Sequence, residues 1–228
     1  MAFIVKITTF CSPLDMLCPH ICRGCGALGE VFCRCCKNYI IHEHDNYCPM
    51  CKRVVLNGKC PNCWLPPTFM VGWRDEFVGK LVHDYKYKST RAIRGALADL
   101  AEQVLPYVDG EVSLVPLPTI EKHIRERGFD HISLLARAIA KKRGWMVEKL
   151  LVRARNTVQV GAGMTARVMQ AVSAYEFSGI IKPERTYILV DDVWTTGASM
   201  KAAIKKLQRA GASKIIVLVL AVNRVDHN

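Results

Sequence analysis

The sequence lacks any run of about 18 uncharged apolar residues, so it contains no predicted transmembrane helix. Its first ten residues, MAFIVKITTF, are too short for a secretory signal and lack its basic start and small-residue cleavage site. We therefore expect a cytoplasmic protein without membrane insertion. Half of the residues are apolar and 23% are charged, which favours a globular chain with a real core over a disordered one.

Acidic residues are scarce. The chain has 20 Asp and Glu against 32 Lys and Arg, which gives a net charge of +12. A surplus of this size suggests polyanionic partners, such as nucleic acid or phosphorylated small molecules. The alternative is that the basic charge only keeps the protein soluble. Most of the surplus lies in residues 66–228, which carry 25 basic and 16 acidic side chains.

Cysteine is absent from the last 165 residues, whereas all eleven cysteines fall at or before position 63. A composition break this sharp indicates a domain boundary. We place it in Trp64-Leu65-Pro66-Pro67, where the double proline stiffens the link. The expected organisation is a cysteine-rich double zinc-ribbon domain over 1–65 and a second domain over 66–228.

Eight of the cysteines form four C-x-x-C pairs, each able to fill two corners of a zinc tetrahedron. Four pairs therefore predict two structural zinc ions. A disulfide framework would need an oxidising compartment, and an iron–sulfur cluster normally needs only one set of four. The spacing leaves open whether the pairs combine in sequence or crossed, and whether a histidine between the pairs replaces a thiolate. The expected ligands are Cys22, Cys25, Cys33, Cys36, Cys48, Cys51, Cys60 and Cys63, with His42 and His44 expected in solvent and Cys11, Cys18 and Cys35 spare.

After Pro66, strand-like and helical patterns alternate. Apolar runs predict strands at 69–73, 186–192 and 214–223, a strand ending in a turn at 112–118, and a strand-like stretch at 145–154. Helical spacing predicts helices at 76–87, 91–105, 131–143 and 198–210, and a short one at 164–172. Strands that are apolar on both faces and separated by helices indicate a parallel sheet covered on both sides, so the fold class is α/β.

The strongest chemical signal is ILVDDVWTTGASM (188–200), in which a buried strand ends at two acids and a hydroxyl-rich loop opens a helix. Backbone N–H groups at a helix start can hold a phosphate, and two carboxylates can accept from ribose hydroxyls or help to hold Mg²⁺. Ordinary helix capping is the simpler alternative. We expect both carboxylates outside the core. The candidate ribose-phosphate residues are Asp191, Asp192, Val193, Thr195, Thr196, Gly197, Ala198 and Ser199, with Asp191 and Asp192 as the catalytic pair.

The same thirteen residues resemble the phosphoribosyl-diphosphate signature of type I phosphoribosyltransferases. Other segments resemble the ComF competence family in that family's order. PLDMLCPHICRGCGALG with its C-x-x-C pairs resembles the zinc-ribbon head, and LVHDYKYKSTRAIRGALADLA (81–101) resembles the YKY segment. VSLVPLPTIEKHIRERGFDHISLLARAIA (112–140) resembles the R-E-R-G-F-N-Q motif, with Asp130-His131 standing for Asn-Gln. Residues 150–177 resemble the L-x-R…R-x-x-N…F stretch, with Gln170 at the Asn position.

This resemblance implies a type I phosphoribosyltransferase-like sheet behind a zinc ribbon, with phosphoribosyl diphosphate and Mg²⁺ as ligands. It also implies a cytoplasmic role in DNA uptake during natural transformation, with single-stranded DNA and a helicase-like competence protein as partners. The alternative is an active phosphoribosyltransferase of nucleotide metabolism, although no recognisable segment for base specificity is present.

Two further groups of residues suit phosphate contacts. Pro116-Leu117-Pro118 resembles a pyrophosphate-binding loop, and His123, Arg125 and Arg127 follow in a polar stretch that would close over a diphosphate or simply be solvated. Basic and aromatic residues interleave in YKYKS, which suits single-stranded nucleic acid but also an ordinary helix end. Trp194 is expected as an exposed flap or as a lid over the ligand. The candidate nucleic-acid contacts are Lys86, Lys88, Arg91 and Arg94.

Overall fold

A computed structural model describes residues 20–44, 47–74, 76–88, 91–154 and 175–224. The predicted helix at 164–172 lies outside these residues, as do Cys11, Cys18 and Gln170. Among the described helices, none is long and apolar enough to cross a membrane.

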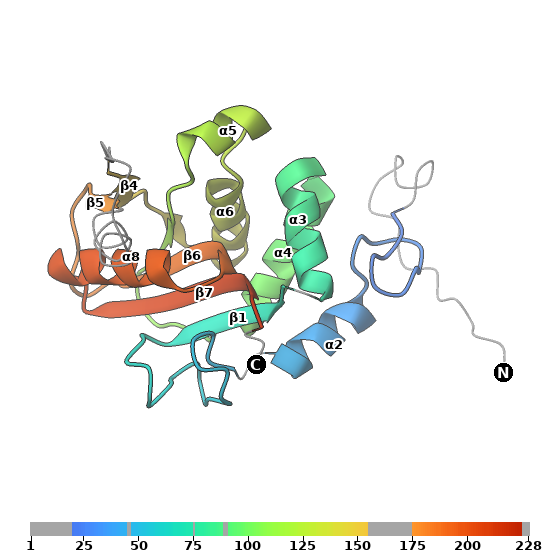
Figure 1. Cartoon of the computed structure of the whole chain (residues 1–228), viewed down its shortest axis with the longest axis horizontal. Coiled ribbons are helices and arrows are strands. Elements are labelled where there is room, and N and C mark those ends of the chain that lie inside the picture. The colour runs from blue at the N-terminus through green and yellow to red at the C-terminus, as the bar shows by residue number, and fades with distance from the viewer. Residues whose placement is uncertain (1–19, 45–46, 75, 89–90, 155–174, 225–228) are drawn as a thin grey trace, which may run out of the picture.

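The centre of the molecule is a five-stranded parallel sheet in the order β1-β7-β6-β2-β3. Figure 1 shows β7 between β1 and β6. Its two longest strands, β6 and β7, lie side by side in the interior, where nearly every side chain is buried. The predicted fold class, a parallel sheet with helices on both faces, is therefore confirmed. The strands span Thr68–Trp73 (β1), Val112–Pro116 (β2), Met146–Val147 (β3), Thr186–Trp194 (β6) and Lys214–Val222 (β7).

Alternate residues of β6 pack into two different cores. Ile188 and Val190 face the helices α3, α4 and α6, whereas Tyr187 and Leu189 face α8. Because strand side chains point alternately to opposite faces, a strand is apolar along the length that is covered on both sides, as β6 is from Tyr187 to Val190. The covering helices span Phe77–Lys88 (α3), Arg91–Val104 (α4), His131–Arg143 (α6) and Ala198–Arg209 (α8).

The structure corrects two of the sequence expectations. The single strand-like stretch at 145–154 is two short strands in different sheets, because β3 pairs with β2 whereas β4 (Leu151–Arg153) pairs antiparallel with β5 (Tyr175–Phe177). The polar stretch after Pro118 contains a seven-residue helix, α5 (Glu121–Arg127), which ends at Gly128 in the left-handed conformation. Gly128 has a φ of 79°, which glycine adopts without steric cost.

In the described part of the cysteine-rich head, the helix α2 (Arg34–His44) packs against the body of the protein. Phe32 and Ile40 lie in the same apolar core as α3 and α4, and the rings of Phe32 and Phe77 are 5.3 Å apart. Lys37 reaches across to Asp99 of α4 at 2.8 Å. The head thus buries Phe32 and Ile40 against the sheet domain. That the two units fold separately remains a prediction.

Arg185 anchors the sheet at the edge where β2 and β6 begin. Its buried guanidinium donates to Glu111 through Nε at 3.0 Å and to Glu148 through Nη1 at 2.9 Å. These two carboxylates outweigh the cost of burial and raise the pKa of Arg185. A planar fork can serve two carboxylates at once, which a single ammonium cannot do in the same geometry.

We therefore expect Arg185→Lys to lower the free energy of unfolding by about 2 kcal/mol, the value of a hydrogen bond to a charged group. Urea denaturation with an unchanged m-value measures it. Arg209→Lys, at an exposed position of α8, is the matched control and should change stability by less than about 0.5 kcal/mol. Equal losses in the two variants would contradict the role given to Arg185.

Candidate functional site

A pocket of about 240 Å³ opens where β2 and β6 end. Parallel strands that end at one edge bring their following residues together, and ligands of open α/β sheets bind there. We call this the carboxylate pocket. Its polar lining residues are Lys86, Thr119, His123, Arg127, His131, Arg153, Tyr175, Asp191, Asp192 and Ser199.

Asp192 is buried in this pocket, with 8% of its surface exposed. Its Oδ2 atom lies 2.5 Å from Nε2 of His131 and 2.7 Å from Nζ of Lys86. Burial acts to raise the pKa of Asp192, but the hydrogen bond from His131 and the charge of Lys86 outweigh it and lower the pKa. The expectation that both carboxylates lie outside the core is therefore wrong for Asp192. Its buried charge is compensated by two donors, Lys86 of α3 and His131 of α6.

Asp191 has a different environment. It is half-buried, and its Oδ1 accepts the backbone N–H of Asp192 at 2.9 Å. Burial, together with the neighbouring charge of Asp192, raises the pKa of Asp191 to about 7. The two acids therefore differ: Asp192 is ionised and paired, whereas Asp191 is ready to change protonation state near neutral pH.

The loop after β6 turns sharply at Gly197, which has a φ of 74° and lies over the indole of Trp194. A Cβ atom at this position would lie 2.3 Å from the Trp194 ring. Trp194 is 3% exposed, so the expectation of an exposed flap or a lid over the ligand is wrong. The loop packs on the buried indole instead. Thr195, Thr196 and Ser199 are exposed above it, and the Oγ1 atom of Thr196 accepts the N–H of Ala198 at 3.4 Å.

The pyrophosphate-loop candidates separate in the structure. Leu117 lines the carboxylate pocket, although its N–H already donates to the carbonyl of Val190. Pro116 lies within β2 and is not part of the lining. Arg127 of α5 lines the pocket, whereas Arg125 is exposed on the same helix and does not.

Sequence reasoning did not select four polar residues that the fold brings to this pocket: Thr119, His131, Arg153 and Tyr175. Arg153 donates from Nε to the carbonyl of Pro118 at 3.2 Å, and its guanidinium lies over the ring of Tyr175. His131 contacts Asp192 from the start of α6. The only signal in the sequence was that His131 stands at a position where the resembling family has Gln. Its neighbour Asp130 has a structural role, since it accepts the N–H of Ser133 and caps α6.

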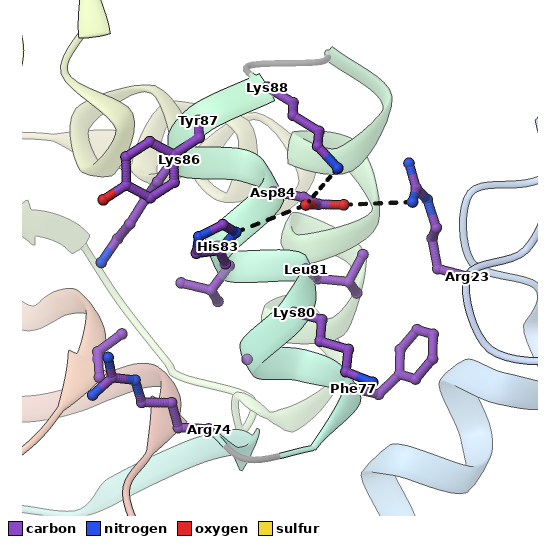
Figure 2. A pocket seen from close by; sticks show the side chains of 13 residues that line it. Arg23, Arg74, Phe77, Lys80, Leu81, His83, Asp84, Lys86, Tyr87 and Lys88 are labelled. Atoms are coloured by element: carbon purple, nitrogen blue, oxygen red, sulfur yellow. Dashed lines mark ion pairs between the residues drawn. The ribbon is translucent and has the colours of Figure 1, made fainter. Parts of the chain in front are cut away.

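A second and larger hollow of about 720 Å³ runs along α3 between the head and the ends of the strands (Figure 2). We call it the α3 groove. Five Lys and Arg side chains line it, against one acid, Asp84, which pairs with Arg23 at 3.5 Å and Lys88 at 2.9 Å. Tyr87 is 65% exposed at its rim. The five cationic residues are Arg23, Arg74, Lys80, Lys86 and Lys88, and Val193 also lines the groove.

The proposed nucleic-acid contacts do not form one patch. Lys86 lines both hollows and pairs with Asp192, whereas Lys88 lines only the α3 groove. Arg94 lies on α4 outside both linings. Arg91 begins α4, and its side chain lies outside the described part of the chain.

The eight predicted metal ligands form two clusters of four, in which all sulfur atoms lie within 4.8 Å of one another. The pairs combine in sequence, first with second and third with fourth, which settles the alternative left open by the spacing. The Sγ atoms of Cys25 and Cys33 are 3.5 Å apart, and those of Cys51 and Cys60 are 3.6 Å apart. A zinc tetrahedron with bonds of about 2.3 Å has edges of about 3.8 Å, so both clusters fit zinc. Cys35 is exposed and lies outside the cluster, and none of the described cysteines forms a disulfide.

The thiols of the first cluster differ in the direction of their pKa shifts. Burial acts to raise the pKa of Cys22, but backbone N–H groups of Cys33, Cys25 and Gly24 lower it to about 6. Burial and the neighbouring thiols raise the pKa of Cys36. Four thiolates this close repel one another unless a cation compensates their negative charge. A structural zinc ion would supply that positive charge.

The class defined by these features is an α/β protein with paired carboxylates at the end of a central strand and two four-cysteine clusters on its head. Two curated proteins are similar to it. The competence protein ComFC of Streptococcus pneumoniae is 25% identical over 191 residues, which cover 80% of this chain and 84% of that protein. The competence protein ComFC of Bacillus subtilis is 24% identical over 196 residues, which cover 80% of each chain. The resemblance to the ComF competence family is thus confirmed.

No protein-family model matches the chain. Among solved structures, glutamine phosphoribosylpyrophosphate amidotransferase from B. subtilis covers 60% of this chain and 30% of its own at 17% identity and a TM-score of 0.43. Adenine phosphoribosyltransferase from Leishmania tarentolae covers 70% of this chain and 80% of its own at 13% identity, also with a TM-score of 0.43. At these TM-scores the likeness carries no argument about this chain.

We expect metal analysis of the purified protein to return two zinc ions per chain, and Gly24→Ala to reduce this to one. A Cβ atom at Gly24 would lie 2.5 Å from the Sγ of Cys36, which displaces that ligand from the first cluster and leaves the second intact. Gly95→Ala, where a Cβ atom meets nothing within 4 Å, is the control and should keep both ions. A wild-type ratio near one, or an unchanged ratio in Gly24→Ala, would contradict this assignment.

Proposed function

We propose that the carboxylate pocket binds phosphoribosyl diphosphate, or another ribose phosphate, together with Mg²⁺. The observation that carries the proposal is the pair of carboxylates at the end of β6, with the start of α8 on one side and cationic side chains from α5 and β4 on the other. A ribose phosphate needs these three features at once: acceptors for its hydroxyls, N–H donors for its phosphate and positive charge for its diphosphate.

Each part of the pocket has a role in this proposal. Asp191 accepts hydrogen bonds from the ribose hydroxyls, and the exposed loop beside the pocket holds the 5-phosphate at the helix start. Ser199, at that helix start, lines the pocket, whereas Thr195 and Thr196 lie outside its lining. Arg127 and Arg153 face the diphosphate, where a guanidinium fork matches phosphate oxygens. Mg²⁺ would be held by the diphosphate and the acids, and it would supply neutralisation of the leaving charge.

We expect Asp191→Asn to weaken the binding of phosphoribosyl diphosphate with Mg²⁺ about 10- to 150-fold at pH 8, the loss of a hydrogen bond to a charged group. The affinity of the wild type should also rise between pH 6 and pH 8, because Asp191, with its pKa raised to about 7, must lose its proton to accept from a hydroxyl and to balance Mg²⁺. Isothermal titration calorimetry measures both effects.

The ligand itself titrates in this pH range, so the variant serves as the control. The ratio of wild-type to Asp191→Asn affinity cancels the ligand's own protonation and should grow from pH 6 to pH 8. A constant ratio would show that Asp191 does not titrate against the ligand. Equal affinities at every pH in a folded variant would remove Asp191 from the site.

We further propose that the α3 groove contacts single-stranded DNA, as part of a cytoplasmic role in DNA uptake with a helicase-like competence protein. The similarity to two competence proteins supports this role, and the five cations and the exposed Tyr87 of the groove suit a phosphate backbone with a stacked base. An active phosphoribosyltransferase is the alternative. It predicts the release of pyrophosphate with one member of a panel of bases, without any need for DNA.

We expect sequence-independent binding of single-stranded DNA with a slope of log affinity against log salt of about −0.7 per phosphate contact, hence near −3 for four contacts. Lys80→Ala with Lys88→Ala, both exposed in the α3 groove, should reduce the slope by about 1.4. Fluorescence anisotropy with a labelled oligonucleotide at several salt concentrations measures it.

The matched control is Lys141→Ala with Lys205→Ala, which removes the same charge from exposed positions on α6 and α8. This control should leave the slope within about 0.3 of the wild type, less than half of one contact. Equal changes in the two double variants would mean that binding follows net charge rather than the groove. No binding of any oligonucleotide at physiological salt would remove the proposed DNA contact.

A further inference from the structure

His131 is buried beside Asp192 and uses both of its ring nitrogens. Its Nε2 atom lies 2.5 Å from Oδ2 of Asp192, and its Nδ1 atom lies 3.2 Å from Nη1 of Arg127. Only 3% of its surface is exposed. The imidazole stands at the first residue of α6, directly after the Asp130 cap, so the backbone that carries it is fixed.

These contacts determine where the imidazole carries its proton. A guanidinium can only donate hydrogen bonds, so Nδ1 of His131 must accept from Arg127. The ring proton is then on Nε2, which donates to the carboxylate of Asp192. Arg127 thus selects the tautomer that His131 needs in order to hold Asp192.

The second donor to Asp192 is of a different kind. Lys86 has a flexible four-carbon side chain that lines both hollows, so it can leave the carboxylate without a change of backbone. His131 has no such freedom, because it is buried and held on both sides. Both donors contact Oδ2, which leaves Oδ1 of Asp192 for a ligand.

We propose that His131 is a positioning residue of the carboxylate pocket: it fixes the orientation of Asp192 for the ligand, and Arg127 fixes His131 in the donating tautomer. The proposal rests on the proposed function, in which this pocket binds a ribose phosphate. A residue that acts in this way is replaceable by any side chain that donates from the same place. A residue needed only for packing is replaceable by any side chain of the same shape.

His131→Phe and His131→Gln separate these two roles. Phenylalanine keeps the ring and removes the donor, whereas the glutamine amide keeps a donor without the ring. We expect His131→Phe to weaken the binding of phosphoribosyl diphosphate with Mg²⁺ about 10- to 150-fold, and His131→Gln to stay within about threefold of the wild type. Equal binding by wild type and a folded His131→Phe, or equal losses in both variants, would overturn the proposal. If His131→Phe does not fold, His131→Met takes its place.

Two spectra of the ligand-free protein test the proposal independently of any ligand. The ¹⁵N signals of His131 should show a protonated Nε2 and an unprotonated Nδ1, and Arg127→Met should give a mixture of tautomers. The carboxyl ¹³C signal of Asp192 should move in His131→Phe and stay in place in His131→Gln. If the wild type does not bind the ligand, the proposed function fails, and these spectra alone decide whether His131 orients Asp192. A proton on Nδ1 in the wild type would overturn the inference.

Discussion

The arrangement of this molecule around its pocket follows from one buried negative charge, the carboxylate of Asp192. A carboxylate taken out of water costs several kcal/mol unless donors compensate it, and nothing next to it in sequence does so. The compensation comes from Lys86 at the end of α3 and His131 at the start of α6, both of which contact Oδ2. Because Arg127 in turn contacts His131, the short helix α5 is tied to the same atom. One charge therefore fixes three helices around the place where β6 ends.

The cysteine-rich head also contains clustered groups whose negative charge must be compensated. A segment of this size buries too little apolar surface to fold unaided, and its clustered thiolates need a cation. Arg23, which lies between the clustered Cys22 and Cys25, reaches Asp84 on α3 and forms one wall of the α3 groove (Figure 2). The first cysteine cluster thus places a side chain on the lining of a groove to which its own cysteines do not contribute.

Sequence reasoning succeeded where one local pattern determines the outcome. β6 and β7 are apolar at almost every position, and α6 has helical spacing between Asp130 and Gly144, so their boundaries were predicted closely. The C-x-x-C pairs identified all eight clustered cysteines for the same reason. It failed where a contact joins distant segments: His131 and Asp192 are 61 residues apart, and no periodicity reveals that pairing. The prediction for Trp194 was wrong for a similar reason, because only the turn at Gly197 shows that the indole lies beneath the loop.

The two hollows are connected through Lys86, which lines both of them and gives its charge to Asp192. Charges a few ångströms apart in a partly buried site interact far more strongly than in water, so an anion in either hollow changes the field in the other. A cation that reaches Asp192 would compete with the Lys86 ammonium, which can then turn toward the α3 groove on its flexible side chain. His131 cannot follow, and it keeps Asp192 in place while the ammonium moves. The pocket is therefore built from one fixed donor and one exchangeable donor on a single carboxylate oxygen.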